Sequence, residues 1–441
     1  MNRPEILTKL PGPKALELIS KDGKYMSPSY NRLFPTVIEK GDGCWVWDVD
    51  ENKFLDFSAG IGVCSTGHCH PAVKTAIKEQ VEKLIHMSGA VFYYPVQIRL
   101  AEKMAEIIPG GMNYKVFFSN SGTEAVEGAI KLARYFTKKS YFIAFIGSFH
   151  GRTIGALSLT GSKAIQRKGF GSLLANVIHV PYGYCYRCSF NLEYPKCNIA
   201  CIEYIENEIF KKIAPAEDVA AIFVEPIQGE SGVIVPPAGY FQKLRELCDK
   251  YQILLVADEV QCGMGRTGKM FGIEHWQTMA DIYCIGKGIA SGLPLGAFVA
   301  KSSVMNWQPG AHASTFGGNP VSCAAALSTI KLLEQSLIEN TERIGMTMLE
   351  RLKALSKKYD FIGEVRGKGL MIGVELVDSS TKKPLTEKRN GVLKKAFEKG
   401  LLLLGAGESV VRFLPPLIIS EEEVNVGLDI LEQSIKEVFN L

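Results

Sequence analysis

The stretch that decides the fold lies between residues 253 and 300, and it begins Ile253-Leu254-Leu255-Val256-Ala257-Asp258-Glu259-Val260-Gln261. It continues to Asp281-Ile282-Tyr283-Cys284-Ile285-Gly286-Lys287-Gly288. Both parts contain a short apolar run, a pattern that is typical of a parallel strand buried on both faces. Asp258 ends the first predicted strand, and Lys287 follows the second. Because open α/β sheets bind ligands at the carboxyl ends of their strands, we expect this acid and this lysine to face one site.

An acid and a lysine in one site are the pair that pyridoxal phosphate chemistry requires. The lysine forms a Schiff base with the cofactor, and the acid keeps the pyridine nitrogen protonated, so that the ring accepts electrons from a substrate carbanion. The alternative is a structural aspartate and a surface lysine, since acids at strand ends occur in many α/β sites. These two residues alone leave both interpretations open.

The composition is that of an ordinary globular protein, with 441 residues of which 46% are hydrophobic and 22% charged. A net charge of only +4 gives no reason to expect binding to nucleic acid or to a membrane surface. The first 25 residues have no apolar signal-peptide core, and no apolar run approaches the roughly 18 to 20 residues of a membrane span. Eleven cysteines without a secretion signal indicate reduced thiols. We therefore expect a cytoplasmic protein.

A repeated order of strand, loop and helix indicates an α/β domain with a mostly parallel sheet between about residues 115 and 300. Besides the two strands above, the pattern predicts strands over 141–146 and 219–224 and helices over 123–137 and 240–251.

The rest of the chain predicts a smaller α+β unit, with a helix-rich segment over 324–356 followed by short strands and helices. We predict that residues 1–57 form an N-terminal segment that contributes to the small domain. Residues 58–330 then form the large cofactor-binding domain, and residues 331–441 form the C-terminal small domain.

A phosphate site is predicted where Phe117-Phe118-Ser119-Asn120-Ser121-Gly122-Thr123-Glu124-Ala125 passes from an apolar strand end into a helix. Free backbone N–H groups and the helix dipole favour a phosphate at such a point. Ser121 and Thr123 add hydroxyl donors, and Gly122 lets the phosphate approach the backbone. Serine and threonine are also ordinary helix caps, so the loop gains weight only beside the lysine and the acid.

Four stretches together are more specific than any one of them. They are Ser121-Gly122-Thr123-Glu124-Ala125, Phe149-His150-Gly151-Arg152-Thr153, Asp258-Glu259-Val260-Gln261 with the glycines that follow it, and Lys287 with Ser314-Thr315-Phe316-Gly317-Gly318-Asn319-Pro320. Their order and spacing resemble the class III aminotransferases, the family of the 4-aminobutyrate, ornithine and acetylornithine aminotransferases. The resemblance covers about residues 30 to 435. It implies an α/β protein of the pyridoxal-phosphate-dependent transferase fold type I, the cofactor pyridoxal 5′-phosphate, and a homodimer with shared active sites.

The resemblance also implies a role for each matching residue. Lys287 corresponds to the Schiff-base lysine and Asp258 to the partner of the pyridinium nitrogen. Phe149 and Val260 correspond to the residues on the two ring faces. The remaining residues expected to bind the cofactor are Ser121, Gly122, Thr123, His150, Glu225, Gln261 at the phenolic oxygen, and Thr315 from the other subunit.

The implied activity is transfer of an amino group from an ω-amino acid, 4-aminobutyrate or ornithine-like, to 2-oxoglutarate in a ping-pong cycle. Lys287 acts in it as general base and acid. By resemblance Arg152 binds a substrate carboxylate and Arg412 the α-carboxylate of the oxo acid, tasks that suit a planar guanidinium. Glu230 corresponds to the glutamate that pairs with this second arginine when an ω-amino substrate is bound, and Ile61 to a residue of the 4-aminobutyrate pocket.

Two other functions remain as alternatives. Amino-acid racemases and epimerases share the fold, but they often lack the arginine after His-Gly and have aspartate in place of Glu230. This sequence has Arg152 and Glu230, which favours the aminotransferase. A non-catalytic relative is the other alternative, and the presence of Lys287 and Asp258 argues against it.

Four cysteines lie in an insertion after Pro181 with the spacing C-x₂-C-x₈-C-x₃-C: Cys185, Cys188, Cys197 and Cys201. Four thiolates are able to bind zinc or an iron–sulfur cluster. The spacing is irregular, however, and the insertion is not part of the family pattern. Free thiols or a disulfide are the simpler interpretations, and we predict no metal site.

Overall fold

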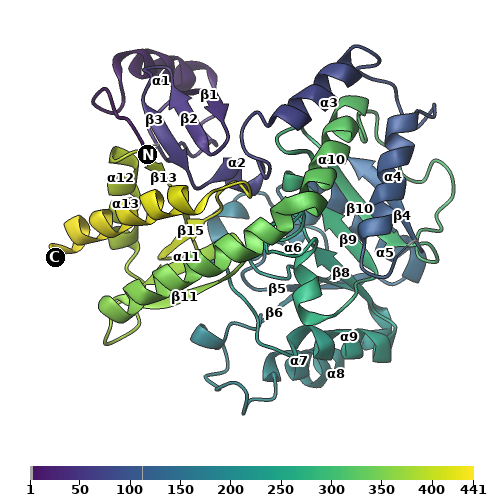
Figure 1. Cartoon of the computed structure of the whole chain (residues 1–441). Helices are drawn as coiled ribbons and strands as arrows, with labels where there is room; N and C mark the ends of the chain where they lie inside the picture. Colours follow the sequence, from purple (N-terminus) through teal and green to yellow (C-terminus); the bar gives the residue numbers. More distant parts are fainter. Residues whose placement is uncertain (1–2, 112) are drawn as a thin grey trace.

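A computed structural model describes residues 3–111 and 113–441 and shows an α/β architecture around a mixed central sheet (Figure 1). The strand order of this sheet is β4-β10-β9-β8-β7-β5-β6. Strand β10 runs antiparallel to both of its neighbours, and the pairs from β9 to β6 are parallel. The strands are β4 (Tyr114–Ser119), β5 (Tyr141–Phe145), β6 (Val177–Val180), β7 (Val219–Val224), β8 (Leu254–Asp258), β9 (Ile282–Ile285) and β10 (Gly296–Lys301).

Strand β8 shows why the continuous apolar runs become central strands. Leu255 and Ala257 pack into the hydrophobic core on one face of the sheet, whereas Leu254 and Val256 pack into the core on the other face. Successive side chains of a strand alternate between the two faces, so both must be apolar where helices cover both. The predicted α/β fold with a mostly parallel sheet is therefore confirmed.

Some helices pack against this sheet, and others lie in the smaller part of the molecule (Figure 1). They are α1 (Pro13–Tyr25), α2 (Ala59–Gly62), α3 (Pro71–Val81), α4 (Pro95–Ile107), α5 (Gly122–Thr137), α6 (Ile154–Leu159), α7 (Ala200–Tyr204), α8 (Phe210–Lys212), α9 (Tyr240–Tyr251), α10 (Pro320–Leu332), α11 (Ile338–Lys358), α12 (Thr386–Glu398) and α13 (Glu421–Phe439). The predicted helices over 123–137 and 240–251 correspond to α5 and α9.

Two smaller sheets have the strand orders β1-β2-β3-β13 and β11-β12-β15-β14. The strands are β1 (Ile38–Asp42), β2 (Trp45–Asp48), β3 (Lys53–Asp56), β11 (Ile362–Lys368), β12 (Met371–Leu376), β13 (Leu401–Leu402), β14 (Leu404–Ala406) and β15 (Val410–Phe413). Strand β3 pairs in parallel with β13, which brings the N-terminal segment beside the C-terminal elements (Figure 1). This pairing supports the proposed domain division, which stays a prediction.

The helical stretch Pro320–Lys358 is long and apolar enough to cross a membrane by length and composition alone. It contacts α3, α4 and β11, as a core helix does. Charged residues such as Lys331 and Glu334 interrupt its apolar residues, so the sequence pattern predicts a helix-rich segment here and no membrane span.

Some elements were not expected from the sequence, and α1 shows the reason. The Asp50 carboxylate accepts hydrogen bonds from the backbone N–H groups of Lys14 at 3.0 Å and Ala15 at 2.9 Å. The helix start is thus capped by a residue distant in the chain, which local sequence patterns do not reveal. The structure also has α4, β10 and β11, which the sequence patterns do not predict.

Candidate active site

A cavity of about 550 Å³ lies at the carboxyl ends of β4, β5, β7, β8 and β9. Parallel strands bring the residues that follow them to one edge of the sheet, where α/β proteins bind ligands. The cavity is lined by Gly60, Ile61, Val63, Ser121, Gly122, Thr123, Phe149, His150, Gly151, Arg152, Glu225, Gly229, Glu230, Asp258, Val260, Gln261, Lys287 and Arg412. The fold thus brings together every predicted site residue except Thr315.

Lys287 follows the end of β9 after Gly286, and its backbone is in the left-handed region with φ of 45°. Its Nζ donates a hydrogen bond to Gln261 Oε1 at 2.8 Å. The pKa of Lys287 is lowered because the side chain is buried, although the charge of Asp258 acts in the opposite direction. A lysine that loses its proton more readily is suited to act as a nucleophile and general base.

Asp258, at the end of β8, is held by two contacts. Its Oδ2 lies 2.7 Å from His150 Nδ1, and its Oδ1 accepts the backbone N–H of Val260 at 3.0 Å. Burial by itself would lower the pKa of His150, but the hydrogen bond and charge of Asp258, with the charge of Glu225, raise it above its usual value. A positively charged imidazole beside the Asp258 carboxylate suits a site in which this carboxylate is the partner of a pyridinium nitrogen.

Glu225 follows β7 and holds the loop that carries Phe149. Its carboxylate accepts the backbone N–H of Phe149 at 2.8 Å and that of Gly229 at 3.1 Å. Burial raises the pKa of Glu225 to about 7. The contacts that the structure shows for Glu225 therefore position the aromatic ring expected to stack on the cofactor.

The predicted phosphate site lies at the start of the long helix α5. Ser121 caps this helix, with its Oγ accepting the backbone N–H of Glu124 at 3.4 Å. A side chain on Gly122 would meet Val260 at 2.7 Å, so only glycine leaves the approach open. Thr123 Oγ1 lies 2.8 Å from Thr153 Oγ1. The first backbone N–H groups and the helix dipole favour a phosphate here.

The residues present fit pyridoxal 5′-phosphate from end to end. The helix start suits the phosphate, Asp258 the ring nitrogen and Lys287 the aldehyde carbon. Gln261 Nε2 lines the cavity as a buried donor without a hydrogen-bond partner in the described part of the chain. A buried donor left unpaired is unfavourable, and the phenolic oxygen of the cofactor would accept its hydrogen bond.

The substrate end of the cavity contains two arginines and a carboxylate. The Arg152 guanidinium lies over the Phe149 ring, 5.3 Å from its centroid. Glu230 Oε1 accepts a hydrogen bond from Lys163 Nζ at 2.6 Å, and Glu230 Oε2 lies 3.6 Å from Arg412 Nη1. Burial lowers the pKa of Arg412, against the charges of Glu230 and Glu225.

Ile61 enters the cavity from a left-handed turn. The φ values are 46° at Ala59, 62° at Gly60, 67° at Ile61 and 74° at Gly62. A β-branched residue is strained in this region, and such strain persists where the surroundings fix the backbone. Here Asp56 Oδ1 accepts the backbone N–H groups of Ser58 at 2.7 Å and Ala59 at 3.1 Å. The Ile61 side chain remains 50% exposed.

One predicted residue lies outside the cavity, and one residue that contacts the site was not predicted. Thr315 is exposed and does not line the cavity of its own chain, so its role stays a prediction that requires a second subunit. Lys163 was not predicted, although it forms an ion pair with Glu230. No motif marks Lys163, because it contacts its partner only through the fold, 67 residues away in the chain.

The cysteine insertion lies apart from this cavity. Cys185, Cys188, Cys197 and Cys201 line a small cavity of their own and are free thiols. Within residues 3–111 and 113–441, no group of three or more histidine, cysteine or acidic residues is placed to hold a metal ion. The insertion is fixed to β12 through Glu375, which bonds Tyr184 Oη at 2.5 Å and Arg187 Nε at 2.7 Å.

A lysine, an acid and a helix start that meet at one edge of a mostly parallel sheet define a pyridoxal-phosphate-dependent enzyme of fold type I. The chain belongs to the aminotransferase class III family, whose sequence model matches residues 25–435. It is therefore a pyridoxal-phosphate-dependent transaminase.

Relatives agree with this family and differ in activity. The chain is 42% identical to acetylornithine aminotransferase of Caldanaerobacter subterraneus, over 96% of this chain and 100% of that protein. It is 40% identical to alanine/serine racemase of Pyrococcus horikoshii, over 99% of this chain and 94% of that protein. A solved structure of the omega transaminase from Pseudomonas jessenii in complex with PMP superposes with a TM-score of 0.89 at 31% identity, and covers 98% of this chain and 99% of that one.

Proposed function

We propose that the enzyme transfers the amino group of an ω-amino acid, 4-aminobutyrate or an ornithine-like compound, to 2-oxoglutarate. The observation that carries this proposal is the arrangement of Arg152, Glu230 and Arg412 in one cavity. Two arginines suit the two carboxylates of the acceptor, since a planar guanidinium binds a carboxylate through two hydrogen bonds. Glu230 beside Arg412 suits a donor that presents no carboxylate to Arg412.

When bound, pyridoxal 5′-phosphate supplies an electron sink for the carbanion that forms on the substrate. We propose that Asp258, Gln261 and the start of α5 hold this cofactor. Phe149 and Val260 restrict the tilt of its ring, and Lys287 holds it covalently between catalytic cycles. Lys287 Nζ would take the proton from the substrate carbon and deliver it to a carbon of the bound cofactor, because returning it to the same carbon would only restore the amino acid. A lowered pKa prepares Lys287 for this task.

Substrate orientation would follow from the two arginines. Arg152 binds the carboxylate at the far end of the donor, which places the ω-amino group near Lys287. Arg412 binds the α-carboxylate of the oxo acid in the second half of the cycle. With a donor bound, Glu230 neutralises the buried charge of Arg412, because a buried charge without a partner is costly.

We also propose a homodimer in the cytoplasm, in which Thr315 of the partner subunit completes the phosphate site. The segment before α4 and the Thr315 loop expose apolar side chains that include Ile85, Val91, Phe92, Tyr93 and Phe316. The ring of His86 lies 5.0 Å from that of Phe316, so the two segments adjoin. Exposed apolar patches of this kind are typical of protein interfaces.

The test is a panel of amine donors supplied with 2-oxoglutarate, with formation of glutamate as the measurement. The proposal expects turnover with 4-aminobutyrate or ornithine and much slower turnover with alanine or serine. Absence of glutamate with every ω-amino donor would refute it.

A second candidate function is racemisation of amino acids, which the similarity to alanine/serine racemase supports. Arg152 and Glu230 favour transfer. Loss of optical activity of alanine or serine in the absence of any oxo acid, without formation of glutamate, would support racemisation instead.

A further inference from the structure

Glu230 lies between two cations and contacts them unequally. Lys163 Nζ donates to its Oε1 at 2.6 Å, whereas Arg412 Nη1 is 3.6 Å from its Oε2, beyond hydrogen-bond distance. The short contact is made by Lys163, which does not line the catalytic cavity, and the long one by Arg412, which does. The carboxylate is therefore held toward Lys163.

Arg412 is left with an incomplete set of partners. It is buried, and its Nε has no hydrogen-bond partner among the described residues. A buried guanidinium with an unpaired donor is unfavourable unless an anion reaches it. Since Glu230 does not make this bond, the free donor suits the carboxylate of a substrate.

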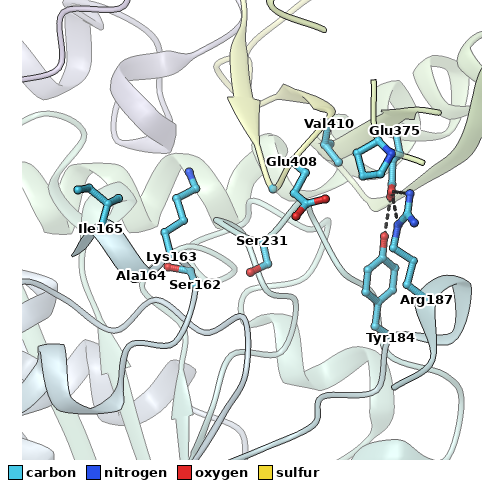
Figure 2. A pocket seen from close by; sticks show the side chains of 12 residues that line it. Ser162, Lys163, Ala164, Ile165, Tyr184, Arg187, Ser231, Glu375, Glu408 and Val410 are labelled. Atoms are coloured by element: carbon cyan, nitrogen blue, oxygen red, sulfur yellow. Dashed lines mark hydrogen bonds and ion pairs between the residues drawn. The ribbon is translucent and has the colours of Figure 1, made fainter. Parts of the chain in front are cut away.

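Lys163 lines two further cavities, one of which shares Glu230 and Arg412 with the catalytic cavity. An outer chamber of about 720 Å³ is lined by Lys163, Glu230 and Arg412 together with α12 and the N-terminal segment. Lys163 also lines a side cavity of about 580 Å³. Tyr184, Arg187 and Glu375 lie on the other side of this cavity (Figure 2). In Figure 2 Glu375 is bonded to Tyr184 and Arg187, so its charge is already matched. Glu408 also lines this side cavity, but the ion pair that the structure shows for Lys163 is with Glu230.

We propose that Lys163 is a positioning residue that draws Glu230 away from Arg412 and thereby keeps Arg412 available for a substrate carboxylate. This inference rests on the proposed function, in which Arg412 binds the oxo acid and Glu230 competes with it. Without Lys163, Arg412 is the cation left in an ion pair with Glu230 among the described residues, and the two close into a hydrogen-bonded pair. An incoming carboxylate must then displace Glu230, whereas a donor that presents no carboxylate to Arg412 is not hindered.

The test compares Lys163→Met with the wild-type holoenzyme. The KM for 2-oxoglutarate should rise about fivefold, the upper range for loss of a partly exposed ion pair, while the KM for the ω-amino donor stays unchanged or falls. Glutarate, a dicarboxylate of the same length that cannot accept an amino group, should bind about fivefold more weakly in calorimetry. Lys163→Arg should keep wild-type values, because the cation remains.

Two controls separate this role from general electrostatics. Lys394→Met removes an exposed lysine from the same outer chamber and should leave both KM values unchanged. In a double-mutant cycle, Lys163→Met should add no further change in glutarate affinity once Glu230→Gln has removed the carboxylate.

The inference is overturned if glutarate binds Lys163→Met as well as wild type, or if the donor KM rises as much as that of 2-oxoglutarate. The latter result would mean that Lys163 contacts the donor itself. Failure of the proposed function is a separate result, namely that the wild-type enzyme forms no glutamate from any ω-amino donor. In that case the glutarate cycle still reports whether Lys163 acts on Glu230.

Discussion

Asp258 Oδ2 and His150 Nδ1 lie 2.7 Å apart in the buried floor of the cavity, so the proposed partner of the cofactor ring has a partner of its own. The imidazole follows β5 and the carboxylate ends β8. Their contact fixes the direction of the carboxylate before any ligand binds. Residues that do not touch the ligand commonly orient a reactive group in this way.

Asp258→Asn keeps the shape of the side chain and removes its charge. We expect kcat to fall about 100- to 1000-fold, the range for loss of one preorganised electrostatic group. Steady-state kinetics with 2-oxoglutarate provide the measurement. His150→Gln should cost less, because it leaves the carboxylate in place, and a larger loss in that variant would contradict the assigned roles.

Lys287→Ala should remove the covalent link to the cofactor. Wild-type protein is expected to be yellow and, after borohydride reduction, to carry the cofactor on the peptide that contains Lys287. The variant should retain no label after the same treatment and should lose essentially all turnover. Lys394→Ala serves as the control, since this lysine is exposed on α12, and label on another peptide would refute the assignment.

Gly122→Ala should weaken binding of the cofactor, because the new methyl group would meet Val260 at 2.7 Å beside the phosphate site. We expect about a tenfold to hundredfold loss of affinity, equivalent to about 1.4 to 2.8 kcal/mol. Titration of the apoprotein, followed by absorbance, measures it. Gly23→Ala is the matched control, because a methyl group there meets no described atom within 4 Å. Equal losses in both variants would show that the effect is not local.

His68 should make stability depend on pH. Burial would lower its pKa, but the hydrogen bond and charge of Asp56, with those of Cys64, raise it from 6.5 to about 10. A raised folded-state pKa gives a stabilisation that is complete below pH 6.5 and is lost as pH rises through about 10. The Tm of the wild type should therefore fall more steeply across this interval than that of His68→Gln. Parallel curves would contradict the contribution of His68.

The cysteine insertion should contain no stoichiometric metal. Elemental analysis of protein purified without chelator is expected to find zinc and iron well below one atom per chain. Treatment with a chelator should leave the Tm unchanged, whereas loss of a structural zinc site would unfold its surroundings. One zinc per chain, abolished by Cys185→Ser, would overturn the prediction.

The features that could be predicted from the sequence are those that local patterns determine. Asp258 and Lys287 follow apolar runs that the structure shows as β8 and β9, and Gly122 and Thr123 begin a helix with a clear amphipathic pattern. Burial on both faces of the sheet dictates such runs, so the strands and the residues at their ends are readable in one sequence.

The features that could not be predicted depend on contacts between distant segments. Lys163 reaches Glu230 through the fold, from 67 residues away in the chain, and Asp50 caps the start of α1 from 35 residues away. Thr315 has its expected partners on another subunit. Resemblance to a family suggests such roles, whereas periodicity and spacing carry no information about them.

The parallel pairing of β3 with β13, with Leu55 opposite Leu401, also constrains how the protein is made. Nearly the entire polypeptide must be synthesised before β13 is available to pair with β3. One edge of β3 therefore remains unpaired during most of synthesis. Contacts of such long range slow folding, and open edges invite association with other chains. Truncation just before β13 should therefore yield aggregates instead of a shortened enzyme.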